Sequence, residues 1–136
     1  MCMDLSLDGP WQAQWVWARA VQRETIERVF FRLDCQLDRP GWLKLHLSAD
    51  SRYRLWLDDQ LLGVGPAASD LMHYYFDSYG QDTPLPVSAG EHRLVVEVLS
   101  YGQLGPFNEM HARGGLMIQG AIVDEHDQPI VSLITP

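Results

Sequence analysis

The chain has 136 residues, of which 46% are hydrophobic and 21% charged, a composition typical of one folded domain and not of a disordered segment. Its formal net charge is −8, and its ten lysine and arginine residues are scattered without a basic run. Nucleic acids and anionic membranes attract clustered positive charge. Composition therefore argues against both as partners and leaves neutral sugars and protein surfaces open.

The amino-terminal sequence and the cysteines bear on location. No apolar run approaches the roughly 20 residues that span a bilayer. Residues 1–11 lack the basic and apolar regions of a secretory signal. The two cysteines, Cys2 and Cys35, do not make a disulfide framework, and Cys35 alternates with apolar positions, as a buried small hydrophobe does. We therefore expect a reducing, cytoplasmic location.

Alternation of apolar and polar residues marks the first predicted strands. Residues 11–17 place three tryptophans and one alanine on one side, which predicts a strand, and 18–27 is a loop or one short helical turn. Residues 28–37 form the next predicted strand, with Phe30 on the outward face beside polar and charged residues. Residues 38–41 contain Pro-Gly and predict a turn.

The most regular alternation runs through the middle of the chain. Residues 43–49 have apolar side chains at every odd position, and 53–57 continue with large residues that favour strands. Residues 58–60 are polar and predict a hairpin turn. The return strand is expected to end at Pro66, because proline cannot donate to a ladder.

The second half of the chain continues the same pattern. Its predicted strands are 73–79, 91–101, 116–123 and 130–134. Its predicted loops and turns are 67–72, 80–90, 102–115 and 125–128. Eight or nine short strands without a long helix predict an all-β chain folded as a single two-sheet antiparallel β-sandwich over 1–136, with the jelly roll as the favoured version.

Metal and cofactor chemistry finds little support in the sequence. The five histidines lie on different predicted elements: His46, His73, His92, His111 and His126. None has ligand spacing, so we expect no metal and no cofactor. His46 and His92 alternate with core positions, which predicts that they lie on solvated strand faces. Calcium binding through Asp50, Asp58 or Asp59 lacks the ordered spacing of a calcium loop.

The sequence gives no more support for a catalytic site. The sequence has no Gly-x-Ser-x-Gly elbow. A glycosidase acid/base pair can be drawn only from acids that the sequence does not bring together: Asp70, Asp77, Glu97 and Glu109. A small stand-alone enzyme is the weakest of the alternatives.

Three stretches carry a family resemblance. They are SADSRYRLWLDDQLLGVGP at 48–66, HYYFDSY at 73–79 and GEHRLVVEVLSYG at 90–102. Together they resemble the β-sandwich accessory domain near the amino terminus of bacterial α-L-rhamnosidases, and the galactose-binding-like sandwiches of related glycosidases, over roughly 28–123. That family usually has Asn-Gly where this chain has Asp58-Asp59. Since Asn-Gly suits a type I′ turn, we expect a different loop here.

The resemblance implies a non-catalytic module whose catalytic acids lie in a separate helical barrel downstream. Such a module either contacts a rhamnose-containing or other neutral carbohydrate or buttresses the catalytic domain. Pro136 directly follows a strand-like run, so we expect this chain to be part of a longer one. An assembly module without a sugar role is the alternative, with outward-facing aromatic residues meeting another protein.

Aromatic rings can stack on sugars while polar groups bind the hydroxyls. The candidate carbohydrate-binding residues are Trp56, His73, Tyr74, Asp77 and Tyr101, with Arg54 and Asn108 as hydrogen-bond partners. About half of the aromatic residues are expected to pack in the core instead.

Overall fold

The computed structural model describes residues 11–18, 26–66, 75–101 and 114–136, which contain nine strands and no helix. The four-stranded sheet has the order β1-β7-β3-β4, with bounds β1 Glu27–Leu37, β7 Gly90–Ser100, β3 Arg52–Leu57 and β4 Gln60–Gly65. The five-stranded sheet has the order β5-β2-β8-β9, with β6 also paired to β2; its bounds are β2 Gly41–Asp50, β5 Asp77–Tyr79, β6 Pro86–Val87, β8 Gly115–Val123 and β9 Pro129–Ile134.

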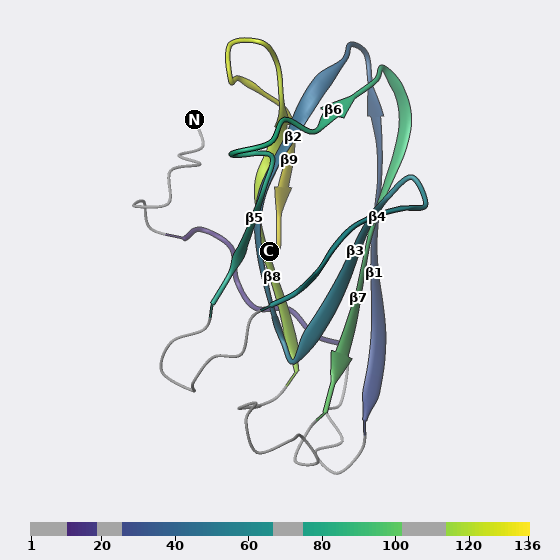
Figure 1. Ribbon diagram of the computed structural model, residues 1–136, viewed down its shortest axis with the longest axis vertical. Coiled ribbons are helices and arrows are strands. Elements are labelled where there is room, and N and C mark those ends of the chain that lie inside the picture. The colour runs from purple at the N-terminus through teal and green to yellow at the C-terminus, as the bar shows by residue number, and fades with distance from the viewer. Residues whose placement is uncertain (1–10, 19–25, 67–74, 102–113) are drawn as a thin grey trace.

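Every strand pair is antiparallel, and the two sheets face each other across the core (Figure 1). The odd-numbered leucines of β2, Leu43, Leu45 and Leu47, have no exposed surface and pack in one cluster with Leu55 and Val98 of the opposite sheet. Full burial of each such side chain contributes roughly 1.5–3 kcal/mol. The predicted two-sheet sandwich is confirmed, and the jelly-roll version of it stays a prediction.

Residues 11–17 do not form the predicted strand. They make a single antiparallel bridge, between Val16 and Leu116. The Gln119 side chain accepts hydrogen bonds from the backbone N–H groups of Gln12 at 2.5 Å and Ala13 at 3.0 Å. A side chain of β8, the Val16–Leu116 bridge and a bond from the Gln14 N–H to the Thr135 backbone oxygen thus hold the segment without a continuous ladder.

The aromatic stretch also forms less strand than predicted. β5 contains only Asp77–Tyr79, while Tyr75 and Phe76 precede it without a ladder. Residues 73–74 lie outside the described parts of the chain, as do the predicted loop at 67–72, residues 102–113 of the predicted loop at 102–115, and most of 18–27. β1 places Phe30 on its outward face as expected.

The outer faces of the two sheets differ. The segment 11–18, purple in Figure 1, begins on the outer side of the five-stranded sheet and then runs toward the four-stranded sheet, where the ring of Trp17 packs against Phe31 of β1. On the five-stranded sheet the rings of Trp11 and Phe76 pack on His46, with centroid distances of 6.1 and 5.5 Å. His46 is only 2% exposed, so its predicted solvation is wrong: the covering segments, invisible in the strand alternation, bury it.

Candidate functional site

The outer face of the four-stranded sheet is open and carries exposed apolar side chains. Phe30 of β1 is 61% exposed, Val64 of β4 58% and Leu61 of β4 52%. Val64 pairs with Arg54 and Leu61 with Trp56, with a register shift between the two pairs. Because the shift inserts an extra residue, Leu61 and Val64 share one face although they are three positions apart.

A buried carboxylate lies at the centre of this open face. Glu97 of β7 is 8% exposed, and its register partners are Phe30 on one side and Arg54 on the other. Its Oε1 lies 2.9 Å from Nε of Arg28, and its Oε2 lies 3.9 Å from Nη1 of Arg54. Two guanidinium groups from different strands therefore compensate the charge that the sheet buries.

A hollow of about 260 Å³ surrounds this ion-pair group. Residues lining it include Arg28, Arg52, Arg54, Val64, Glu97 and Tyr101. Two of the candidate carbohydrate-binding residues, Arg54 and Tyr101, thus lie in one hollow. Trp56 follows Arg54 on the same outward face of β3 and is half-buried.

The structure does not bring Asp77 to the open face. Its carboxylate accepts a hydrogen bond from the Tyr53 hydroxyl, which also lies 2.8 Å from the hydroxyl of Tyr79. Burial, together with the hydrogen bond to Asp77, raises the pKa of Tyr53 well above its ordinary value. A Cβ at Gly65 would meet the Asp77 carboxylate and the Tyr53 ring, so this position needs glycine. Asp77 therefore ties β5 to β3 across the core.

The remaining candidate sugar-binding residues, His73, Tyr74 and Asn108, lie outside the described residues. Sequence analysis had not singled out Arg28, Arg52 or Glu97 as members of a site on this face. The available signal was Glu97 itself, an acid within the apolar run of β7, but its partners come from strands that only the register identifies.

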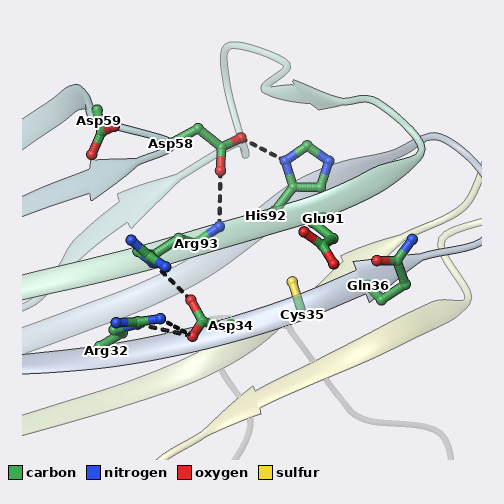
Figure 2. A pocket seen from close by; sticks show the side chains of 9 residues that line it. All are labelled: Arg32, Asp34, Cys35, Gln36, Asp58, Asp59, Glu91, His92 and Arg93. Carbon is green, nitrogen blue, oxygen red and sulfur yellow. Dashed lines mark hydrogen bonds and ion pairs between the residues drawn. The ribbon is translucent and has the colours of Figure 1, made fainter.

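A second, polar cleft of about 730 Å³ lies between β1, β7 and the β3–β4 turn (Figure 2). In it Asp34 accepts hydrogen bonds from Arg32 Nε and Arg93 Nε, each at 2.8 Å. These bonds, first that of Arg32 and then that of Arg93, lower the pKa of Asp34 to about 2. The thiol of Cys35 lies half-buried at the same cleft, and burial raises its pKa.

The buried His92 side chain links two segments of the chain at the end of this cleft. Its Nδ1 lies 2.5 Å from Oδ2 of Asp58, and its Nε2 lies 2.6 Å from the backbone oxygen of Ser88 (Figure 2 shows the Asp58 bond). Both neighbours accept, so the protonated ring donates to each, and the bond to Asp58 is the main cause of the raised pKa of His92. With its side chain only 7% exposed, its predicted solvation is also wrong.

The β3–β4 turn has the type I′ backbone geometry that the sequence analysis did not expect for Asp58-Asp59. Asp58 and Asp59 have φ angles of 48° and 65°, the positive values that a two-residue type I′ turn requires. The expected different loop is therefore wrong. The Asp58 carboxylate accepts from His92 and, at 2.8 Å, from the backbone N–H of Arg93. These bonds stabilise a conformation that usually favours asparagine and glycine.

Among the residues that the structure describes, no three or more potential metal ligands come together, and no helix is long and apolar enough to cross a membrane. Comparisons of the chain with models of protein families, with curated proteins and with solved structures found no match. The resemblance to rhamnosidase accessory domains therefore rests on the three sequence motifs alone.

Proposed function

We propose that this chain is a non-catalytic β-sandwich module of an α-L-rhamnosidase-like glycoside hydrolase, and that its open face packs against the catalytic domain. The observation that carries the proposal is the exposure of Phe30, Leu61 and Val64 on one outer sheet face. Phe30 lies on β1 and Leu61 and Val64 on β4, the two edge strands of this sheet, with Glu97 and Arg54 between them. A sheet face that exposes several apolar side chains is typical of a contact with another protein surface. Two of the three stretches of the resemblance, 48–66 and 90–102, contain β3, β4 and β7 of this same sheet, and the third contains β5 of the other sheet.

The character of the open face favours a protein contact over a sugar platform. Sugar platforms present aromatic rings beside groups that bind hydroxyls. Here the half-buried Trp56 lies beside the aliphatic Leu61, which offers no hydrogen bond to a sugar hydroxyl. Arginine and aromatic residues, which this face also presents in Arg54 and Phe30, are enriched in protein interfaces.

The arginines indicate the charge of the partner surface. The chain as a whole has a net charge of −8, yet Arg28, Arg52 and Arg54 all line the hollow on the open face. Electrostatic complementarity selects a partner of opposite local charge. The partner surface is therefore apolar with acidic groups facing Arg28 and Arg54, whose side chains are 61% and 62% exposed.

The test is the size of the native polypeptide in its source cells, by immunoblot with an antibody against this domain. A product several times larger than a 136-residue chain, active on aryl rhamnosides, is expected. A product of 136 residues would overturn the accessory-module proposal and leave assembly with a separate protein as the role of the open face.

The non-catalytic part of the proposal has its own test. The purified 136-residue chain is expected to release no aryl alcohol from aryl rhamnosides above the uncatalysed rate. Turnover that follows the folded chain through gel filtration, and is lost when one carboxylate is replaced by its amide, would overturn it.

A further inference from the structure

Strand β1 is an edge of the four-stranded sheet, and no described strand pairs with its outer edge, the side that faces away from β7. It is 11 residues long, pairs with β7 without a register shift, and contains neither glycine nor proline. The other edge strand, β4, has 6 residues, two of them glycine, and pairs with β3 through a register shift. Natural edge strands are commonly shortened or bulged in this way, because a long regular edge is a template for another strand. β1 lacks this protection.

The hydrogen bonds of β7 indicate which backbone groups of β1 face its outer edge. The Leu99 C=O accepts from the Ser51 N–H at 3.1 Å, and the Arg93 C=O accepts from the Asp58 N–H at 2.9 Å. Odd-numbered residues of β7 therefore direct their backbone groups toward β3, and its even-numbered residues bond with their odd-numbered register partners on β1. The outer edge consequently presents the N–H and C=O groups of the even-numbered residues of β1: Phe30, Arg32, Asp34 and Gln36.

These groups restrict how a second copy of β1 can pair with this edge. In an antiparallel pair related by a twofold axis, residues that present N–H and C=O groups lie opposite one another, so the axis passes through one residue. With the axis at Leu33, Arg32 lies opposite Asp34 of the second copy on both sides of the axis. With the axis at Arg32 or Asp34, like charges lie directly opposite each other, which is destabilising. Within one chain Arg32 and Asp34 already pair at 2.8 Å, so the register extends an existing ion pair and needs no unpaired charge.

Apolar contact favours the axis at Leu33 over one at Phe31. An axis at Phe31 also avoids like charges, but the Phe31 ring already packs against Trp17 within the chain. Leu33 is 41% exposed, although its neighbours on the same side of β1, Phe31 and Cys35, pack against the core. It borders an apolar groove of about 240 Å³ between β1 and β9, an edge strand of the other sheet. Leu33 of a second copy, directly opposite, would meet this exposed side chain at the mouth of the groove.

We propose that β1 is a dimerisation edge, through which two copies of this chain pair antiparallel around Leu33. Their four-stranded sheets then form one continuous sheet. Because the twofold axis between antiparallel neighbours is perpendicular to the sheet, the open faces of both copies lie on the same side. The inference concerns the edge of the sheet and needs neither a catalytic domain nor a sugar, so it does not rest on the proposed function.

The test is disulfide formation between copies of the 136-residue chain that carry Cys2→Ser and Cys35→Ser. Leu33→Cys in this background places two thiols at a strand pair whose Cα atoms are about 4.5 Å apart, within the range that a disulfide spans. Leu61→Cys is the matched control, because Leu61 is 52% exposed but lies on the opposite edge strand. With oxidised glutathione, we expect a covalent dimer from Leu33→Cys and none from Leu61→Cys.

Sedimentation equilibrium makes the test independent of the cysteine variants. The unaltered chain is expected to form a reversible dimer at roughly 100 μM. Arg32→Asp places a carboxylate opposite Asp34 of the second copy and should weaken the dimer by about tenfold or more. Lys44→Asp changes the net charge equally but lies on β2 of the other sheet, so it should weaken the dimer by less than about threefold.

A chain that stays monomeric at roughly 100 μM would overturn the proposal and leave the outer edge of β1 to a strand of another protein. Equal weakening by Arg32→Asp and Lys44→Asp, or equal crosslinking of Leu33→Cys and Leu61→Cys, would also overturn it, because association would then not depend on this edge. None of these results affects the proposed docking of the open face, which is tested on the native polypeptide.

Discussion

The outer faces of the two sheets differ in which side chains they bury, and each departs from the usual pattern of buried apolar and exposed polar residues. The covered face of the five-stranded sheet buries polar side chains, His46, Ser48 and Gln119, each at most 3% exposed. The open face of the four-stranded sheet exposes apolar ones, among them Phe30 and Val64. Default strand alternation would predict polar residues on exposed faces and apolar residues on buried ones.

Hydrogen bonds explain the covered face. Ser48 Oγ donates to the backbone oxygen of Tyr75 at 2.6 Å, and Gln119 accepts from two backbone N–H groups of the amino-terminal segment. His46 Nδ1 lies 2.9 Å from Oγ of Ser78. Buried polar groups that are satisfied in this way fix where a covering segment sits. The open face has the opposite chemistry, which suits a cover supplied by another protein surface.

The largest expected difference between the two faces is in the free energy of unfolding that is lost when a tryptophan is replaced by alanine. Trp11→Ala removes the ring that contacts His46 and, at 5.1 Å between centroids, Phe76. We expect it to lower the free energy of unfolding by about 2–3 kcal/mol, and Trp56→Ala on the open face by about 1 kcal/mol. Urea denaturation measures both. Equal losses would mean that the covering segment adds no more to stability than the open face does.

Loss of a buried acceptor should have the next largest effect. Gln119→Leu leaves the N–H groups of Gln12 and Ala13 without their partner, and we expect a loss of about 1–3 kcal/mol. The matched control is Gln36→Leu on the exposed side of β1, which should change stability by less than about 0.5 kcal/mol. Hydrogen exchange at residues 12 and 13 should accelerate only in the first variant.

The contribution of His92 and Asp58, at the polar cleft of the four-stranded sheet, to the free energy of unfolding should depend on pH. The pKa of His92 is raised above its ordinary 6.5, so its contribution to stability is complete below that pH and is lost as the pH rises through the raised pKa. The pKa of Asp58 is lowered from 3.8 by its bonds to His92 and Arg93, although burial opposes them. Its contribution is therefore present above pH 3.8 and lost as the pH falls through the lowered pKa.

The free energy of unfolding should consequently decline as the pH rises above about 6.5. The variant His92→Gln should lose this decline, and His126→Gln, whose side chain is 78% exposed, should retain it. Denaturant titrations at several pH values measure the slope. A wild-type slope that survives in His92→Gln would place the titrating group elsewhere.

The smallest effect on stability is expected on the open face itself. Phe30→Ser removes a ring that is 61% exposed, so the free energy of unfolding should change by less than about 0.5 kcal/mol. Thermal unfolding measures this change. A loss of more than about 1.5 kcal/mol would show that Phe30 supports the fold and is not free for a partner.

Period-two alternation was sufficient to predict β1, β2, β7, β8 and β9 to within a few residues, because each buries one face. It failed at 11–17 because an alternating segment can also cover a sheet that is already complete. It failed at His46 and His92 for a related reason: their burial depends on Trp11, Phe76 and the β3–β4 turn, which are distant in the sequence.

The candidate site was less predictable than the fold. Trp56 was chosen as an aromatic residue able to stack on a sugar and Arg54 as a hydrogen-bond partner, and the structure places both on the outward face of β3. The group around Glu97 was missed because its members come from β1, β7 and β3, and only the pairing of Glu97 with Phe30 and Arg54 brings them together. Register between distant strands is fixed by the assembled sheets, not by local sequence.

The central claim is that a protein surface covers the open face in the native polypeptide. Hydroxyl-radical footprinting tests it most directly, by comparing the oxidation rate of Phe30 in the polypeptide isolated from its source cells with that in the 136-residue chain. Trp15, 42% exposed and away from the open face, is the internal control. Strong protection of Phe30 with an unchanged Trp15 rate is the predicted result. Equal Phe30 rates in the two samples would contradict the claim.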